Sequence, residues 1–118
     1  MADLTMESEH RGDVVVIHAR GFINAHTVRQ FEAEIERALE SGRNRIVING
    51  SGLSYIASAG LGVIMGHIED VRSKGGDIRL TNLNETVLSI LEVLGFNHVC
   101  RVFDSEEEGV ASYSHSNA

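Results

Sequence analysis

The sequence predicts an α/β domain with one mixed β-sheet, antiparallel at its start and parallel in its core, and about four α-helices. Two observations predict this class. Short β-branched or apolar runs alternate with longer segments in which apolar residues recur at helical spacing. The first two runs are separated by a turn around Gly12, whereas each later pair is separated by a helix-length segment. A tight turn joins antiparallel strands, and a helical crossover joins parallel ones.

The N-terminal segment predicts a hairpin followed by a helix. Residues 13–21 (DVVVIHARG) carry a β-branched run typical of a strand, and residues 4–10 are expected to pair with it. The following segment has apolar residues at helical spacing. Asn24 is in position to cap the start of this helix, and Gly42 is in position to end it.

The middle of the chain predicts a buried strand, a glycine-rich turn and a second helix. Residues 45–49 (RIVIN) are a short apolar run of the kind that is buried on both faces of a sheet. The stretch GSGLSYIASAGLG follows it. We expect the second helix to begin near Ala59 and to end at Lys74, with Gly75 after it.

The C-terminal third predicts two more strands and two more helices. Residues 77–83 and 99–103 are the strand segments. The third helix is expected to start at Asn84 and to end at Gly95, where a left-handed residue is common. A capping box that starts at Ser105 predicts the beginning of the fourth helix.

Length and composition indicate one domain spanning residues 1–118, with a core of about 5–113 and a flexible tail at 114–118. The chain has 118 residues and a formal net charge of −7, and its ten lysines and arginines are scattered along the sequence. This distribution argues against nucleic-acid binding. No apolar run is long enough to insert into a membrane and the first residues do not resemble a signal peptide, so a cytoplasmic location is expected. The single cysteine, Cys100, is expected to be a buried, inert thiol.

Residue patterns for catalysis and metal binding are weak. No two of the six histidines stand four residues apart, and no Cys-x-x-Cys occurs, so no metal site is predicted. Neither Ser54 nor Ser58 lies in Gly-x-Ser-x-Gly, which argues against a serine hydrolase. The glycine-rich turn could offer backbone amides to a nucleotide phosphate, but no lysine or arginine lies between Arg45 and Arg72. The sequence therefore predicts no enzyme and no cofactor, with nucleotide binding as a minor alternative.

Ser58 is the candidate functional residue. If the second helix begins at Ala59, Ser58 is its N-cap, a role that contributes about 1 kcal/mol. The same position suits phosphorylation, because a helix N-terminus tolerates negative charge and small neighbours leave room for a kinase. Residue chemistry alone does not decide between a structural cap and a phosphorylated switch.

Several motifs in order resemble the anti-sigma factor antagonist family, the STAS domain. They are ARGFINAHTVRQFEAEI, then IVINGSGLSYIASAGLGVIMG with GGDIRL after it, then NLNETVLSILEVLGF. The resemblance covers roughly residues 5–113 and implies the STAS fold. Asn49 matches a family position that has Asp or Asn, and we expect its side chain to satisfy loop backbone groups. Ala57 stands where the family commonly has an aspartate before the phosphorylated serine.

The resemblance implies partner switching. The unphosphorylated antagonist would bind an anti-sigma factor serine kinase, with a histidine-kinase-like ATPase fold, and so release a sigma factor. Phosphorylation of Ser58 would end that binding, and a PP2C-type phosphatase would reverse it. The expected docking surface includes the loop from Gly52 to Ile56, the exposed face of the second helix and the start of the first. Its residues are Asn24, His26, Ser54, Tyr55, Ile56, Ala57, Ala59, Gly60, Leu61 and Gly62.

Two further roles remain open on the resemblance. STAS domains also serve as scaffold modules that are not phosphorylated and as parts of lipid-transport complexes, and the missing aspartate before Ser58 favours these roles if it disables phosphorylation. The sequence also leaves a homodimer open.

Overall fold

The central element of the fold is a five-stranded sheet with strand order β1-β2-β3-β4-β5. The computed structural model describes residues 3–114. β1 (Leu4–Arg11) is antiparallel to β2 (Val14–Ile23), and β2, β3 (Arg45–Ile56), β4 (Asp77–Thr81) and β5 (Val102–Phe103) are parallel. The mixed sheet predicted from the sequence is therefore confirmed.

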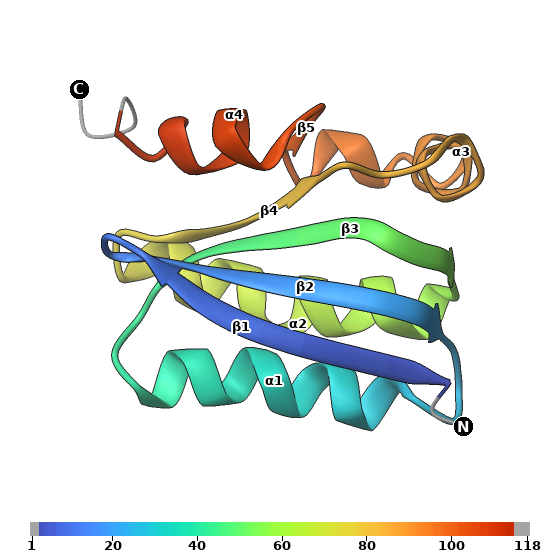
Figure 1. Ribbon diagram of the computed structural model, residues 1–118, viewed down its shortest axis with the longest axis horizontal. Coiled ribbons are helices and arrows are strands. Elements are labelled where there is room, and N and C mark those ends of the chain that lie inside the picture. Colours follow the sequence, from blue (N-terminus) through green and yellow to red (C-terminus); the bar gives the residue numbers. More distant parts are fainter. Residues whose placement is uncertain (1–2, 115–118) are drawn as a thin grey trace.

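The helices lie on both sides of this sheet. α1 (Val28–Glu40) and α2 (Ser58–Ser73) run side by side along one face, and α4 (Glu106–Ala111) lies on the other (Figure 1). α3 (Glu85–Val93) and the short 3₁₀ helix η1 (Phe96–His98) connect β4 to β5. None of the described helices is long and apolar enough to cross a membrane. The four predicted helices are confirmed.

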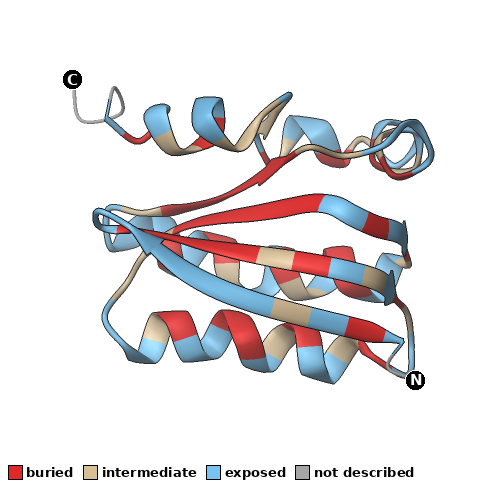
Figure 2. Ribbon diagram, viewed as in Figure 1, coloured by how far each residue is buried: buried red, intermediate tan, exposed pale blue. Residues whose placement is uncertain are grey.

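Burial follows the position of each strand in the sheet. β4 is buried along its whole length, and β2 and β3 are buried in their first halves, whereas β1 is mostly exposed (Figure 2). The main core lies between the sheet and the pair α1 and α2, where Phe31, Ile35 and Ile64 are almost fully buried. A smaller cluster, with Val16 and Val47 at its centre, lies on the α4 face. The β-branched run of β2 contributes to both clusters because successive strand residues point to opposite faces.

Local signals for turns and caps are confirmed at several positions. Gly12 and Gly95 have φ of 66° and 72°, the left-handed conformation that glycine adopts without a steric cost. Asn84 and Ser105 cap α3 and α4 by accepting hydrogen bonds from the amides of residues three positions later. Of the predicted flexible tail, residues 115–118 lie outside the described part of the chain.

Several expectations for element boundaries are wrong. The last strand is only Val102–Phe103 rather than residues 99–103, because the chain leaves η1 through a turn and a bend. α1 is capped at Thr27, not Asn24; the Asn24 side chain instead accepts hydrogen bonds from the amides of His26 and Thr27 and closes a turn before the helix. β3 does not stop at residue 49 but continues to Ile56 as a strand beside β2. The glycines had indicated a turn there, but Gly52 is needed within the strand because a Cβ would lie 2.6 Å from Cγ of Arg20.

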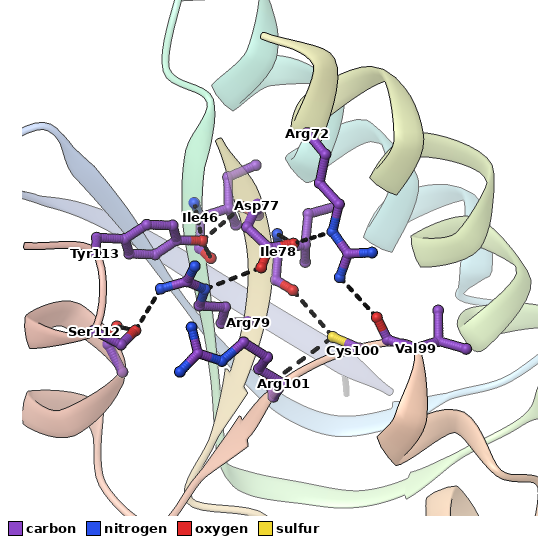
Figure 3. Close-up of polar contacts among 11 residues, drawn as sticks. Ile46, Arg72, Asp77, Ile78, Arg79, Val99, Cys100, Arg101, Ser112 and Tyr113 are labelled. Atoms are coloured by element: carbon purple, nitrogen blue, oxygen red, sulfur yellow. Dashed lines mark hydrogen bonds and ion pairs between the residues drawn. The ribbon is translucent and has the colours of Figure 1, made fainter. Parts of the chain in front are cut away.

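A buried polar cluster attaches Ser112 and Tyr113, the residues that follow α4, to the sheet (Figure 3). The Tyr113 hydroxyl lies 2.6 Å from the Asp77 carbonyl oxygen and 2.7 Å from that of Ile46, and it accepts a hydrogen bond from the Ile46 amide. The Arg79 guanidinium stacks 3.9 Å from the centre of the Tyr113 ring and donates to a carboxylate oxygen of Asp77 at 3.0 Å. Burial raises the pKa of the Tyr113 hydroxyl above its ordinary value, so it stays protonated as a donor.

Cys100 is buried under the same cluster. Its thiol donates to the Ile78 carbonyl oxygen at 3.0 Å. Burial, assisted by the nearby Asp77 carboxylate, raises the pKa of this thiol from 9.0 to about 12. The interpretation of Cys100 as a structural thiol is consistent with both observations.

We predict that Tyr113→Phe lowers the free energy of unfolding by about 1–3 kcal/mol, because the Ile46 amide and the Asp77 carbonyl oxygen lose a buried partner. Urea unfolding followed by circular dichroism measures the change. Tyr55→Phe is the matched control, since Tyr55 is 43% exposed and its substitution should change stability by less than about 0.5 kcal/mol. Equal effects of the two substitutions would contradict the anchoring role.

We also predict that Cys100 reacts with a thiol reagent at pH 8 only when the protein unfolds. A pKa of about 12 in place of 9.0 lowers the thiolate fraction at this pH by roughly a thousandfold. Labelling by a maleimide, followed by mass spectrometry with and without urea, tests this. Rapid labelling in native buffer would disprove burial of the thiol.

The same pKa difference predicts that the free energy of unfolding falls as pH rises from 9 towards 12, because the thiol of the unfolded chain ionises first.

Candidate functional site

The site is built where β3 passes into α2. Ser58 is the first residue of α2 and is exposed, and the residue before it, Ala57, is the N-cap with extended backbone angles. The expectation that Ser58 caps the helix is therefore wrong by one position. Its hydroxyl makes no hydrogen bond to any other described residue. The Ser58 hydroxyl is therefore exposed to solvent and does not cap the helix.

One backbone hydrogen bond fixes the start of α2 against the sheet. The Ala57 amide donates to the Ile23 carbonyl oxygen at 2.8 Å, beyond the last residue of β3. The Ala57 carbonyl oxygen then accepts from the Gly60 amide at 2.9 Å, which closes the first turn of the helix. The geometry of the first turn of α2 is thus tied to the end of β2.

The same hydrogen bond brings the beginning of α1 close to Ser58. Asn24 directly follows Ile23, and Ala57 directly precedes Ser58, so the turn of residues 24–27 starts beside the first turn of α2. In this turn Thr27 Oγ1 donates to the Phe22 carbonyl oxygen at 2.7 Å. His26 is exposed, and Asn24 is partly exposed. The structure therefore brings the predicted site residues of these two segments together.

Three of the predicted docking residues are buried and form the support of the site. Ile56 and Leu61 are 3% and 4% exposed, and Gly60 is also buried. A Cβ at Gly60 would lie 2.6 Å from Ile23 Cγ2 and 2.9 Å from Ile56 Cγ1. Their inclusion in the docking surface is corrected here, because side chains packed into the core are not available to another protein.

The outward face of the first half of α2 carries mostly small residues. Ala59, Gly62 and Gly66 are exposed, and a Cβ at either glycine would meet nothing within 4 Å. Met65, 53% exposed, lies at the edge of this face. Glycine in a helix interior costs about 1 kcal/mol relative to alanine, and no contact within the described residues explains why Gly62 and Gly66 are glycines. We refer to Ser58, Ala59, Gly62, Met65 and Gly66 as the α2 face.

The predicted loop from Gly52 to Ile56 is the end of β3. Ser54 is exposed, and Tyr55 is paired in register with Phe22 of β2. Tyr55 and Phe22 are 43% and 47% exposed, which makes an aromatic pair at the end of the sheet. Sequence reasoning missed Phe22, because the aromatic residue lies in another strand and only the register brings it beside Tyr55.

Asn49 behaves as expected from the sequence. Its side-chain oxygen accepts a hydrogen bond from the Ser51 amide at 2.9 Å, and its side-chain nitrogen donates to Glu106 at 2.9 Å. The residue is 8% exposed. It therefore supports the second half of β3 and links it to α4.

The geometry expected of a nucleotide-binding turn is absent from the described chain. Gly50 and Gly52 lie inside β3, so their amides are part of a strand rather than of a phosphate-binding loop at the start of α2. The space beside them is filled, since a Cβ at Gly50 would lie 2.7 Å from Leu83 Cδ2. The glycines allow close packing of β3 on its neighbours.

Two groups of metal-ligand side chains converge away from the α2 face. One consists of Glu9, His18 and Glu106, and the other of Glu32, Glu36 and His67. Each group combines residues from at least two elements, and only Glu32 and Glu36, four residues apart in α1, have a spacing that the sequence shows. Hydrogen bonds already join His18 to Glu9 and His67 to Glu32, both at 3.0 Å. Glu106 also pairs with Arg11, so these contacts connect neighbouring elements of the fold.

Comparison with known families identifies the domain. The family model described as "STAS domain" matches residues 5–109. The chain belongs to the STAS domain family. The resemblance in the motifs around Ser58 is therefore confirmed, and the match extends from the second residue of β1 through β5 into α4.

Similar proteins agree with this assignment. The anti-sigma F factor antagonist of Paenibacillus polymyxa is 27% identical to this STAS domain over 105 residues, 88% of this chain and 90% of that protein. BtrV of Bordetella bronchiseptica, a candidate anti-sigma factor antagonist, is 31% identical over 94 residues, 80% of this chain and 81% of that protein. The Bacillus cell fate determinant SpoIIAA, solved in its phosphorylated form, is 26% identical with a TM-score of 0.69, over 92% of this chain and 98% of that one.

We predict opposite effects of alanine at two glycines of α2. Gly60→Ala should lower the free energy of unfolding by about 1–3 kcal/mol, because its Cβ would overlap Ile23 and Ile56. Gly62→Ala should raise it by about 0.5–1 kcal/mol, because the added methyl group meets nothing and the helix propensity improves. Urea unfolding of both variants measures this, and a shift in the same direction for both would contradict the packing described.

Proposed function

We propose that this STAS domain is an anti-sigma factor antagonist that acts by partner switching. The unmodified protein binds an anti-sigma factor serine kinase of histidine-kinase-like fold and thereby releases a sigma factor. Phosphate on Ser58 ends this binding, and a PP2C-type phosphatase restores it. The observation that carries the proposal is the exposed Ser58 hydroxyl at the first position of α2, in a family whose similar members include anti-sigma factor antagonists.

The proposed docking surface is the α2 face together with neighbouring exposed residues. These are Asn24, His26, Ser54 and Tyr55, with Ala57 partly exposed beside them. Gly62 and Gly66 allow the backbone of α2 to approach a partner closely, and Met65 and Tyr55 offer apolar contact area at its edges. Buried Ile56, Gly60 and Leu61 hold the surface in shape from beneath.

A phosphate on Ser58 acts locally in this proposal. A hundredfold loss of affinity requires only ~2.8 kcal/mol. A phosphate dianion carries about −1.5 to −2 charges and its own hydration, and burying it against a flat contact surface without counter-charges opposes binding. The N-terminus of α2 tolerates the added charge, so the fold itself need not change.

Ala57 affects the proposed modification in two ways. The aspartate common at this family position would place a carboxylate beside the phosphate, and alanine removes that like-charge repulsion. The Ala57 amide is already committed to Ile23, so the cap geometry does not depend on its side chain. We propose that Ser58 remains a kinase substrate despite the change.

We expect the cognate kinase and ATP to place one phosphate on Ser58, forming the Ser58 Oγ–phosphorus bond and releasing ADP and the hydroxyl proton. Intact-mass and peptide mass spectrometry would show a single added phosphate on the wild type and none on Ser58→Ala. Ser73→Ala is the matched control, an exposed serine at the other end of α2 and outside the docking surface, and should be phosphorylated as the wild type is. Phosphate that persists on Ser58→Ala would falsify the assignment.

Calorimetry with the unmodified kinase completes the test. Ser58→Ala should bind as the wild type does, and Ser58→Asp should bind at least tenfold more weakly. Equal binding of both variants would exclude the switch. Absence of binding by the wild type to any such kinase would favour a scaffold or lipid-transport role instead.

A further inference from the structure

A hollow of about 250 Å³ lies between the edge strand β1 and helix α1, outside the proposed docking surface. Met6, Val15 and Ala38 form its apolar walls, and Ser8, Glu34 and Arg37 form most of its polar wall. Figure 1 shows β1 running beside α1, and the hollow lies towards the C-terminal half of that helix. The hollow is formed by β1, β2 and α1, whereas Ser58 is the first residue of α2. Binding of a ligand in the hollow therefore does not depend on the proposed function.

The unusual member of this wall is Glu34. It is only 9% exposed and stands on the core-facing side of α1 with Phe31, Ile35 and Ala38. A carboxylate at such a position is unfavourable for folding unless it is compensated, and an apolar residue would pack there without that cost. Ser8 Oγ donates to Glu34 Oε2 at 2.6 Å, which aligns the carboxylate between β1 and α1.

The only cation that the described residues pair with Glu34 is Arg37, one helical turn further on. The Arg37 side chain is 75% exposed, so water screens this pair. A carboxylate accepts about four hydrogen bonds, and Ser8 and Arg37 account for two described ones. Glu34 therefore has capacity to accept hydrogen bonds from a further donor.

We propose that the hollow binds a small organic cation, a primary ammonium with a short apolar chain. The ammonium group donates to the Glu34 carboxylate, and the chain contacts Met6, Val15 and Ala38. The volume is larger than that of a cavity that holds benzene, so it has room for a ligand with about five non-hydrogen atoms. Such a small ligand gives a dissociation constant on the order of millimolar.

The first test compares ligands of one shape and different charge. Butylammonium, 1-butanol and butyrate are titrated into isotopically labelled full-length protein at pH 8. Butylammonium should give saturable amide shift changes centred on Ser8 and Glu34, butanol should bind at least tenfold more weakly, and butyrate should not bind. Equal binding of butyrate or butanol, or no saturable shifts with butylammonium, overturns the proposal.

The second test distinguishes the contribution of the Glu34 carboxylate from that of the volume of the hollow. Glu34→Gln keeps the shape of the side chain and should weaken butylammonium binding at least tenfold. Glu36→Gln, which removes an exposed carboxylate from the same helix, should leave the affinity unchanged. Ala38→Leu fills the hollow while the Glu34 side chain stays in place, and it should abolish binding. Thermal melts check that each variant is folded, and unchanged binding by either Glu34→Gln or Ala38→Leu contradicts the assigned site.

Discussion

The pairing of β3 with β2 along its full length is the constraint on which the rest of the site depends. Because β3 continues as a strand to Ile56, the chain reaches the far end of the sheet before α2 begins. The hydrogen bond from Ala57 to Ile23 then fixes the first turn of the helix, and Gly60 lets that turn pack directly on Ile23 and Ile56. The position of Ser58 therefore follows from strand register and one close contact, both of which belong to the core.

The opposite face of the sheet is held by charged groups rather than by a large apolar cluster. α4 has only six residues and covers a small valine cluster, too little apolar area to hold a helix by itself. Asp77, Arg79 and Tyr113 supply the remaining attachment through buried hydrogen bonds and ring stacking (Figure 3). Since each of these polar groups is buried, loss of one partner leaves the others unsatisfied, which makes the end of the chain sensitive to single substitutions.

Much of this architecture could be predicted from the sequence because its signals are local. The β-branched run of β2, the turn at Gly12 and the cap at Asn84 each depend on a few adjacent residues. The end of β3 could not be predicted in this way, because the glycines at 50 and 52 indicate a turn in the sequence. The close contacts with Leu83 and Arg20 that require glycine at these two positions are visible only in the folded structure. The start of α2 near Ser58 could be predicted, but Ser58 is not the predicted N-cap, and the position of the cap at Ala57 accompanies the hydrogen bond from Ala57 to Ile23. The burial of Glu34 and the pairing of Phe22 with Tyr55 are tertiary facts with no sequence spacing to reveal them.

Ser58 is exposed and its hydroxyl makes no hydrogen bond to another described residue, and this has a consequence for how long a signal can persist. In the proposed switch, the forms with and without phosphate on Ser58 share the same fold. The change between them therefore includes no slow refolding step that could delay the response. The lifetime of each state is then set entirely by the enzymes that add and remove the phosphate. Such a domain reports the present balance of those two activities and retains no record of earlier ones.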